Sequence, residues 1–174
     1  MHRSEILSKE FLLNENFNGN LTVKSDNLKN SNFFNEILLT SNYVGEKIEL
    51  SNSKLLNKKI GSLNVDYGNI YLDENDLFFK GKFSFEIFDK NKFYRKFLVS
   101  KKNQKDIEKV YFGLIYNLSK SDAKIFFISL NDDKPEMSDN LDNLIYSFNN
   151  NSITVNNWIS LRSFINKILS SYPG

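Results

Sequence analysis

Carboxylates are the side chains best placed for chemistry in this sequence. Asp132, Asp133 and Lys134 directly follow the apolar run 124–130, which is typical of a buried strand. Ligand sites of sheet proteins tend to lie at the carboxyl ends of strands, and a D-x-K arrangement can hold a divalent metal beside a phosphate group. The pattern therefore predicts a candidate Mg²⁺ site with Asp132 and Asp133 as ligands, and the alternative is an acidic surface loop.

The order of elements over about the last hundred residues loosely resembles the PD-(D/E)xK nuclease superfamily. In that resemblance Asp76 stands for the first catalytic acid, and Glu86 stands for the acid of the E-x-K motif. The lysine expected two positions after Glu86 is absent, and the only D-x-K pairs occur later, at 122–124 and 132–134. The resemblance implies a metal-dependent nuclease-like protein with a displaced site, for which Mg²⁺ would be the cofactor. Without it, no cofactor is predicted.

Several other chemistries are excluded by composition. The chain has no cysteine, and its single histidine is His2. The sequence therefore lacks a thiolate nucleophile, a His-dependent triad and the ligand spacing of a zinc finger. The seven glycines form neither a dinucleotide fingerprint nor a P-loop.

The stretch 76–102 concentrates lysine and phenylalanine and is the strongest binding candidate. Exposed cations there could bind phosphate, and a tyrosine could stack on an unpaired base. Two phenylalanines share the lysine face at strand ends and could anchor a protein interface. Lysines on a hairpin also discourage edge association, so a solvated face is the alternative. The predicted binding residues are Lys80, Lys82, Tyr94, Arg95, Lys96, Lys101, Lys102, Phe78 and Phe88.

Charge is nearly balanced in total but segregated along the chain. The 23 basic and 21 acidic residues leave a net charge of +2, whereas residues 80–105 carry nine basic and two acidic side chains. Residues 131–142 carry five acids and one lysine. Such segregation suits contact with a partner or with another copy of the chain, and it makes a polyanion-binding role local rather than global. The excess of asparagine and lysine is typical of an AT-rich genome.

The hydrophobic periodicity predicts a single α+β domain spanning 1–174. Residues 1–43 are expected to form an N-terminal helical flank with helices near 4–13 and 31–41, and a short strand at 20–25. Residues 44–100 alternate like an antiparallel β-meander that ends in a hairpin with arms at 76–87 and 93–99. Residues 101–174 are expected to be helix, strand, helix, strand and helix, at 104–120, 124–130, 141–148, 152–155 and 156–172. The buried strand 124–130 would extend the meander into a mixed sheet, with helices packed on it and an amphipathic helix at the C-terminus.

Two functions follow from these patterns. The first is a non-enzymatic interaction or assembly module that binds a protein partner, or itself, through the lysine and aromatic hairpin and the C-terminal helix. The second is the nuclease-like or nucleic-acid-binding protein described above. The sequence shows no apolar run of membrane-spanning length and no secretory signal, which predicts a cytoplasmic protein without a membrane partner.

Overall fold

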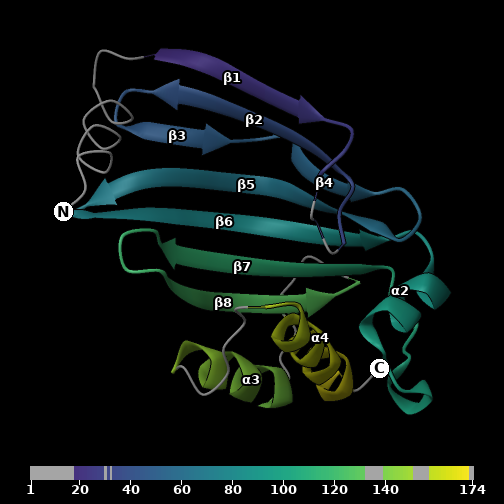
Figure 1. The fold of residues 1–174 in the computed structure, drawn as a ribbon. Helices are drawn as coiled ribbons and strands as arrows, with labels where there is room; N and C mark the ends of the chain where they lie inside the picture. Colours follow the sequence, from purple (N-terminus) through teal and green to yellow (C-terminus); the bar gives the residue numbers. More distant parts are fainter. Residues whose placement is uncertain (1–17, 30, 32, 132–138, 151–156, 173–174) are drawn as a thin grey trace.

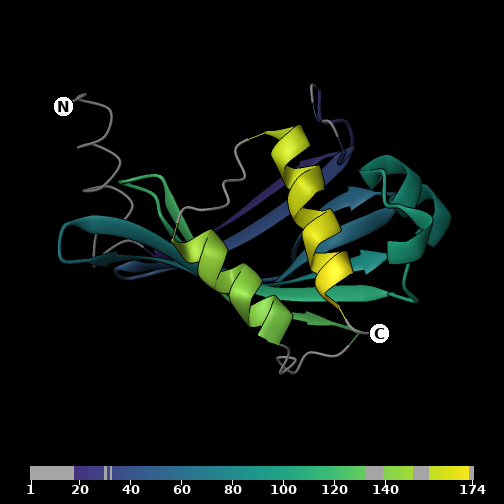
Figure 2. The same ribbon diagram turned by 90° about the horizontal axis from the view of Figure 1, so that it is seen from below.

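The computed structural model describes residues 18–29, 31, 33–131, 139–150 and 157–172. They form an eight-stranded antiparallel sheet with helices on one of its faces (Figures 1 and 2). The strands are β1 (Asn18–Ser25), β2 (Glu36–Val44), β3 (Lys47–Leu50), β4 (Ser53–Asn57), β5 (Gly61–Asp73), β6 (Asp76–Ile87), β7 (Lys109–Asn117) and β8 (Asp122–Leu130). The helices are α2 (Lys90–Phe97), the 3₁₀ turn η1 (Lys101–Asn103), α3 (Asp139–Asn149) and α4 (Trp158–Ser171). The α+β class and the C-terminal amphipathic helix are confirmed.

The sheet is a meander in which sequence neighbours pair. Its order is β1-β2-β3-β5-β6-β7-β8, and β4 lies in the same lane as β3, since both pair with β2 and β5. Between β3 and β4 the chain turns outward at Asn52, which has a left-handed φ of 54°. At this point the backbone groups of Thr40 on β2 are bonded by a side chain. The buried Ser53 hydroxyl accepts from Thr40 N (2.8 Å) and donates to Thr40 O (3.0 Å). Strands β3 and β4 together therefore fill the position between β2 and β5, and the sheet is continuous there.

All described strand pairs are antiparallel, so the prediction of a mixed sheet is wrong. Among the described strands, β8 pairs only with β7 and lies at an edge of the sheet. Its expected burial on both faces is likewise wrong: Ile125 and Ile128 face the helices, whereas Phe126 keeps 41% of its surface exposed. An antiparallel sheet can leave one face in water, and β8 does so at Phe126, whereas Ser129 near its end is fully buried.

Three segments take a different secondary structure from the predicted one. Residues 36–44 are strand β2 where a helix was predicted, and residues 109–117 are strand β7 inside the predicted helix 104–120. Conversely, the second hairpin arm is helix α2, because Asp89 caps it: its carboxylate accepts from Lys92 N at 2.9 Å. The predicted helix 4–13 and strand 152–155 lie outside the described residues.

The core lies between the helices and the half of the sheet formed by β5 to β8. Helices α3 and α4 cross beneath β7 and β8, and α2 closes the end of the sheet where β6 ends (Figure 2). Phe93, Ile128, Leu130, Leu141 and Leu169 are each at most 2% exposed. This arrangement brings α2, α4 and the segment before β2 together at one end of the molecule.

Candidate ligand-binding site

Helix α4 begins with a capping box that fixes the side chains of its first turn. The Asn157 side chain accepts from Ser160 N at 2.9 Å, and the Ser160 hydroxyl accepts from Asn157 N at 3.1 Å. Trp158 is the first helical residue, and Arg162 follows four positions later on the same face. The cap therefore places an indole and a guanidinium side by side at the start of α4.

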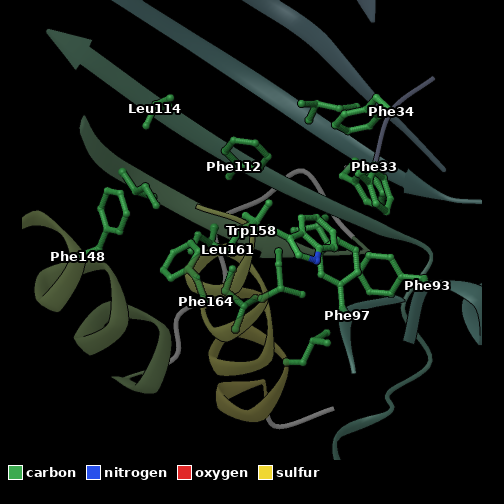
Figure 3. A pocket seen from close by; sticks show the side chains of 18 residues that line it. Phe33, Phe34, Phe93, Phe97, Phe112, Leu114, Phe148, Trp158, Leu161 and Phe164 are labelled. Carbon is green, nitrogen blue, oxygen red and sulfur yellow. The ribbon is translucent and has the colours of Figure 1, made fainter. Parts of the chain in front are cut away.

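A cavity of about 250 Å³ lies between this helix and the sheet (Figure 3). Figure 3 shows Phe93 and Phe97 of α2, Phe112 and Leu114 of β7, and side chains of α3 and α4 around it. All the described residues that line it are apolar or aromatic: Phe33, Phe34, Leu63, Phe85, Phe93, Phe97, Val110, Phe112, Leu114, Ile125, Ile128, Phe148, Trp158, Leu161, Phe164, Ile165, Ile168 and Leu169. A cavity with such walls gives water no hydrogen-bonding partners.

A second, open depression of about 980 Å³ lies at the end of the molecule where α2, α4 and the loop after β4 meet, and we call it the basic groove. Among the described residues, six of its side chains are cationic and one is a carboxylate. Its lining residues are Asn35, Glu36, Asn57, Lys58, Lys59, Ile60, Lys92, Arg95, Lys96, Trp158 and Arg162.

Two of the six cations are neutralised by neighbouring carboxylates. The Lys58 ammonium lies 2.6 Å from Glu36, and this hydrogen bond raises the pKa of the lysine above 10.5. The Lys92 ammonium lies 2.6 Å from Asp89, and the hydrogen bonds from Lys92 lower the pKa of that carboxyl below its ordinary 3.8. The lysine of each pair is exposed to solvent, so both pairs contribute little to stability. They do remove two positive charges from the groove.

The other four cations have no carboxylate within ion-pair distance among the described residues. They are Lys59, Arg95, Lys96 and Arg162. The Nε of Arg162 is also buried and has no acceptor in the described part of the chain. Buried donors are nearly always satisfied in folded proteins. The groove thus holds an excess of positive charge and one unused donor.

Trp158 is common to the two sites. Its ring lies 6.0 Å from Phe33 and 5.3 Å from Phe97 on the cavity side, measured between ring centroids. On the groove side the Lys96 ammonium lies 5.2 Å from the same ring, within cation–π distance. A single indole therefore lines both an apolar chamber and a cationic surface.

Of the nine predicted binding residues, only Arg95 and Lys96 line this groove. Tyr94 is buried, where its hydroxyl donates to the Lys105 carbonyl, so the expected base-stacking position is wrong. Lys101 and Lys102 are exposed on η1 and do not line the groove.

The remaining predicted binding residues lie elsewhere. Lys80 and Lys82 extend from β6 on the face away from the helices, where they lie 5.9 and 5.8 Å from the rings of Phe126 and Phe127. Phe78 stacks on Tyr71 at 5.9 Å, and Phe88 is half exposed after β6. The continuous hairpin surface that the sequence predicted is therefore divided between two faces.

The predicted carboxylates do not converge. Asp76 and Glu86 lie at opposite ends of β6, about 33 Å apart at roughly 3.3 Å per residue. Asp76 is already engaged, because it lies 2.5 Å from the Lys120 ammonium and accepts from Asn117. Asp132, Asp133 and Lys134 lie outside the described residues. Within the described ranges no three metal-ligating side chains cluster.

Sequence reasoning missed Lys58, Lys59, Trp158 and Arg162. Trp158 was recognised only as part of the C-terminal helix stripe. Trp158 lies four positions before Arg162, which is one of only three arginines in the chain. This spacing is the one local signal in the sequence of a helix face that is both aromatic and cationic.

The fold and site define an α+β protein with an aromatic chamber beside a cationic groove. No family model, curated protein or solved structure matches the chain at a significant level. Among the described helices, none has the length and apolar character needed to cross a bilayer.

Proposed function

We propose that this chain is a non-enzymatic binding module that holds an anionic group in the basic groove. One observation carries the proposal: four cations from three separate segments converge there without a carboxylate partner among the described residues. Elsewhere among the described residues some cations are paired, as Lys90 is with Asp106 and Glu108, and others, such as Lys80 and Lys82, lie on strand faces without a carboxylate partner. An anion would balance the charge that the fold leaves open.

The proposal narrows the interaction module predicted from the sequence. Arg95 and Lys96 keep a binding role, whereas Lys80 and Lys82 lie on the other face of the sheet. Arginine adds specificity, because its planar fork can hold a carboxylate or phosphate through two hydrogen bonds. The buried Nε of Arg162 would gain from an acceptor placed beside its guanidinium.

The experiment uses the single tryptophan of the chain as its reporter. Trp158 lines the groove, so inorganic pyrophosphate bound there should change its fluorescence in a saturable way, against a titration with chloride at equal ionic strength. Binding should weaken as salt is raised. The double substitution Lys59→Gln and Arg162→Gln should weaken it at least tenfold.

A matched control removes the same charge from the other face. Lys80→Gln with Lys82→Gln also deletes two cations and should leave pyrophosphate affinity unchanged. Equal losses in both double variants would show attraction to net charge alone and would overturn the proposal, as would no saturable binding. Labelled DNA and RNA test the nucleic-acid function separately: binding that depends on Lys80 and Lys82 would place the phosphate surface on the sheet instead.

A further inference from the structure

We infer that the ligand is an amphiphile whose anionic head lies in the basic groove and whose apolar part, of about ten carbon atoms, fills the aromatic cavity. The inference rests on the proposed function, since it adds a tail to the anion already assigned to the groove. The two sites share Trp158, so a molecule that passes this indole contacts both.

The cavity sets the size of the apolar part. A cavity of about 150 Å³ lined by aliphatic and aromatic side chains binds benzene, which has six carbons. At the same volume per carbon, 250 Å³ accommodates about ten carbons. A linear ten-carbon chain or two fused rings satisfies this limit.

The walls of the cavity fix the chemistry of that part. Apart from the indole N–H of Trp158, the lining side chains contain no polar group, so a hydroxyl or charge placed inside would lose its hydrogen bonds to water. The whole polar portion of the ligand must therefore stay on the groove side. Trp158 suits this boundary, because an indole combines a large apolar surface with one polar atom.

The charge of the groove fixes the sign of the head. Lys96 lies over the face of Trp158, and Arg162 lies one helical turn along α4 from it. A carboxylate or phosphate at this position would meet both cations, whereas a quaternary ammonium head would be repelled by four unpaired positive charges. A fatty acid and an alkyl phosphate present the same chemistry to this site.

The first experiment is a chain-length series followed by Trp158 fluorescence below the micelle concentration. Hexanoate, octanoate and decanoate should bind with affinity rising about fourfold per methylene, which corresponds to about 0.8 kcal/mol for each buried CH₂. Dodecanoate and tetradecanoate should gain little further, because the cavity is full at about ten carbons. An affinity that rises without a break through fourteen carbons would indicate adsorption to a surface and would overturn the inference.

The second experiment varies the head at constant tail. Decanoate and decyl phosphate should both bind, with their ratio identifying the better head. 1-Decanol should bind at least tenfold more weakly, and decyltrimethylammonium more weakly still. Equal affinity for all four would mean that the cavity takes an apolar ligand without help from the groove, and would overturn the assignment of an anionic amphiphile.

Failures of the two proposals can be told apart. If pyrophosphate binds and decanoate binds no better than acetate, the groove holds anions and the cavity is not used, so only this inference falls. If pyrophosphate does not bind and 1-decanol binds as well as decanoate, the proposed anion site falls together with it. Ile165→Phe narrows the cavity and should weaken decanoate while leaving pyrophosphate unchanged, and urea unfolding checks that this variant folds.

Discussion

Val110→Ile is predicted to stabilise the ligand-free protein, which is the opposite of the usual effect of enlarging a buried side chain. Val110 is 8% exposed on β7 and lines the aromatic cavity, so the added methylene has space to occupy. Isoleucine keeps the β-branch that suits a strand.

The magnitude follows from the cavity. One methylene that enters this space should recover about 0.8 kcal/mol. In a fully packed core, the same enlargement typically costs about 1–3 kcal/mol through strain. The sign of the change therefore reports whether the cavity is present.

Val99→Ile is the matched control. Val99 is 6% exposed and belongs to the same core, but it does not line the cavity. Urea unfolding at 25 °C, followed by far-UV circular dichroism and by Trp158 fluorescence, gives the free energy of unfolding of each variant. We expect Val110→Ile to gain stability and Val99→Ile to lose it. Destabilisation of both by similar amounts would refute the reasoning from the cavity.

Three further predictions concern the scaffold. Gly61→Ala should lower the free energy of unfolding by about 3 kcal/mol in urea melts, since its Cβ would lie 2.2 Å from the Glu86 carbonyl oxygen. Asn157→Ala removes the α4 cap and should cost about 1 kcal/mol in the same assay while weakening pyrophosphate binding, because it loosens the first turn that carries Trp158. Tyr94→Phe should cost about 1 kcal/mol by removing the hydrogen bond from its hydroxyl to the Lys105 carbonyl, which keeps its bond from Ile107 N. Burial raises the Tyr94 pKa above 10.0, so its contribution is complete below pH 10 and is lost as pH rises through the folded-state pKa; the variant should lose less stability than the wild type above pH 10.

Two amphipathic helices near the C-terminus were among the predictable parts of the fold. The apolar residues of α4 recur at helical spacing and form a stripe along one face. The helix predicted at 156–172 is confirmed as α4, Trp158–Ser171. The predicted helix at 141–148 is confirmed within α3. Strand β8 was found because a short continuous apolar run is too brief for a buried helix. Its edge position was not predictable, since it depends on which strands pair.

The errors arose where two periods fit the same residues. In α2 the buried Phe93 and Phe97 are four apart, a spacing shared by one face of a helix and one face of a strand. In β7 both faces carry large apolar side chains, so residues at helical spacing can be picked from a strand; its central Gly113 argued against a helix. Tertiary pairing decides such segments.

The candidate site was less predictable than the fold. The basic groove combines residues 58–59 and 95–96 with Trp158 and Arg162, which come from segments tens of positions apart and meet only when α4 packs against α2. Taken from the sequence alone, each of these segments predicts only charged side chains exposed to solvent. The cavity is harder still, because its phenylalanines are indistinguishable in sequence from ordinary core residues.

The decisive measurement is a structure of the complex with decanoate. We expect the carboxylate to lie within hydrogen-bond distance of Arg162 or Lys96, and the alkyl chain to pass Trp158 into the cavity lined by Phe112 and Phe148. A chain bound outside the cavity, or a carboxylate remote from both cations, would contradict this expectation.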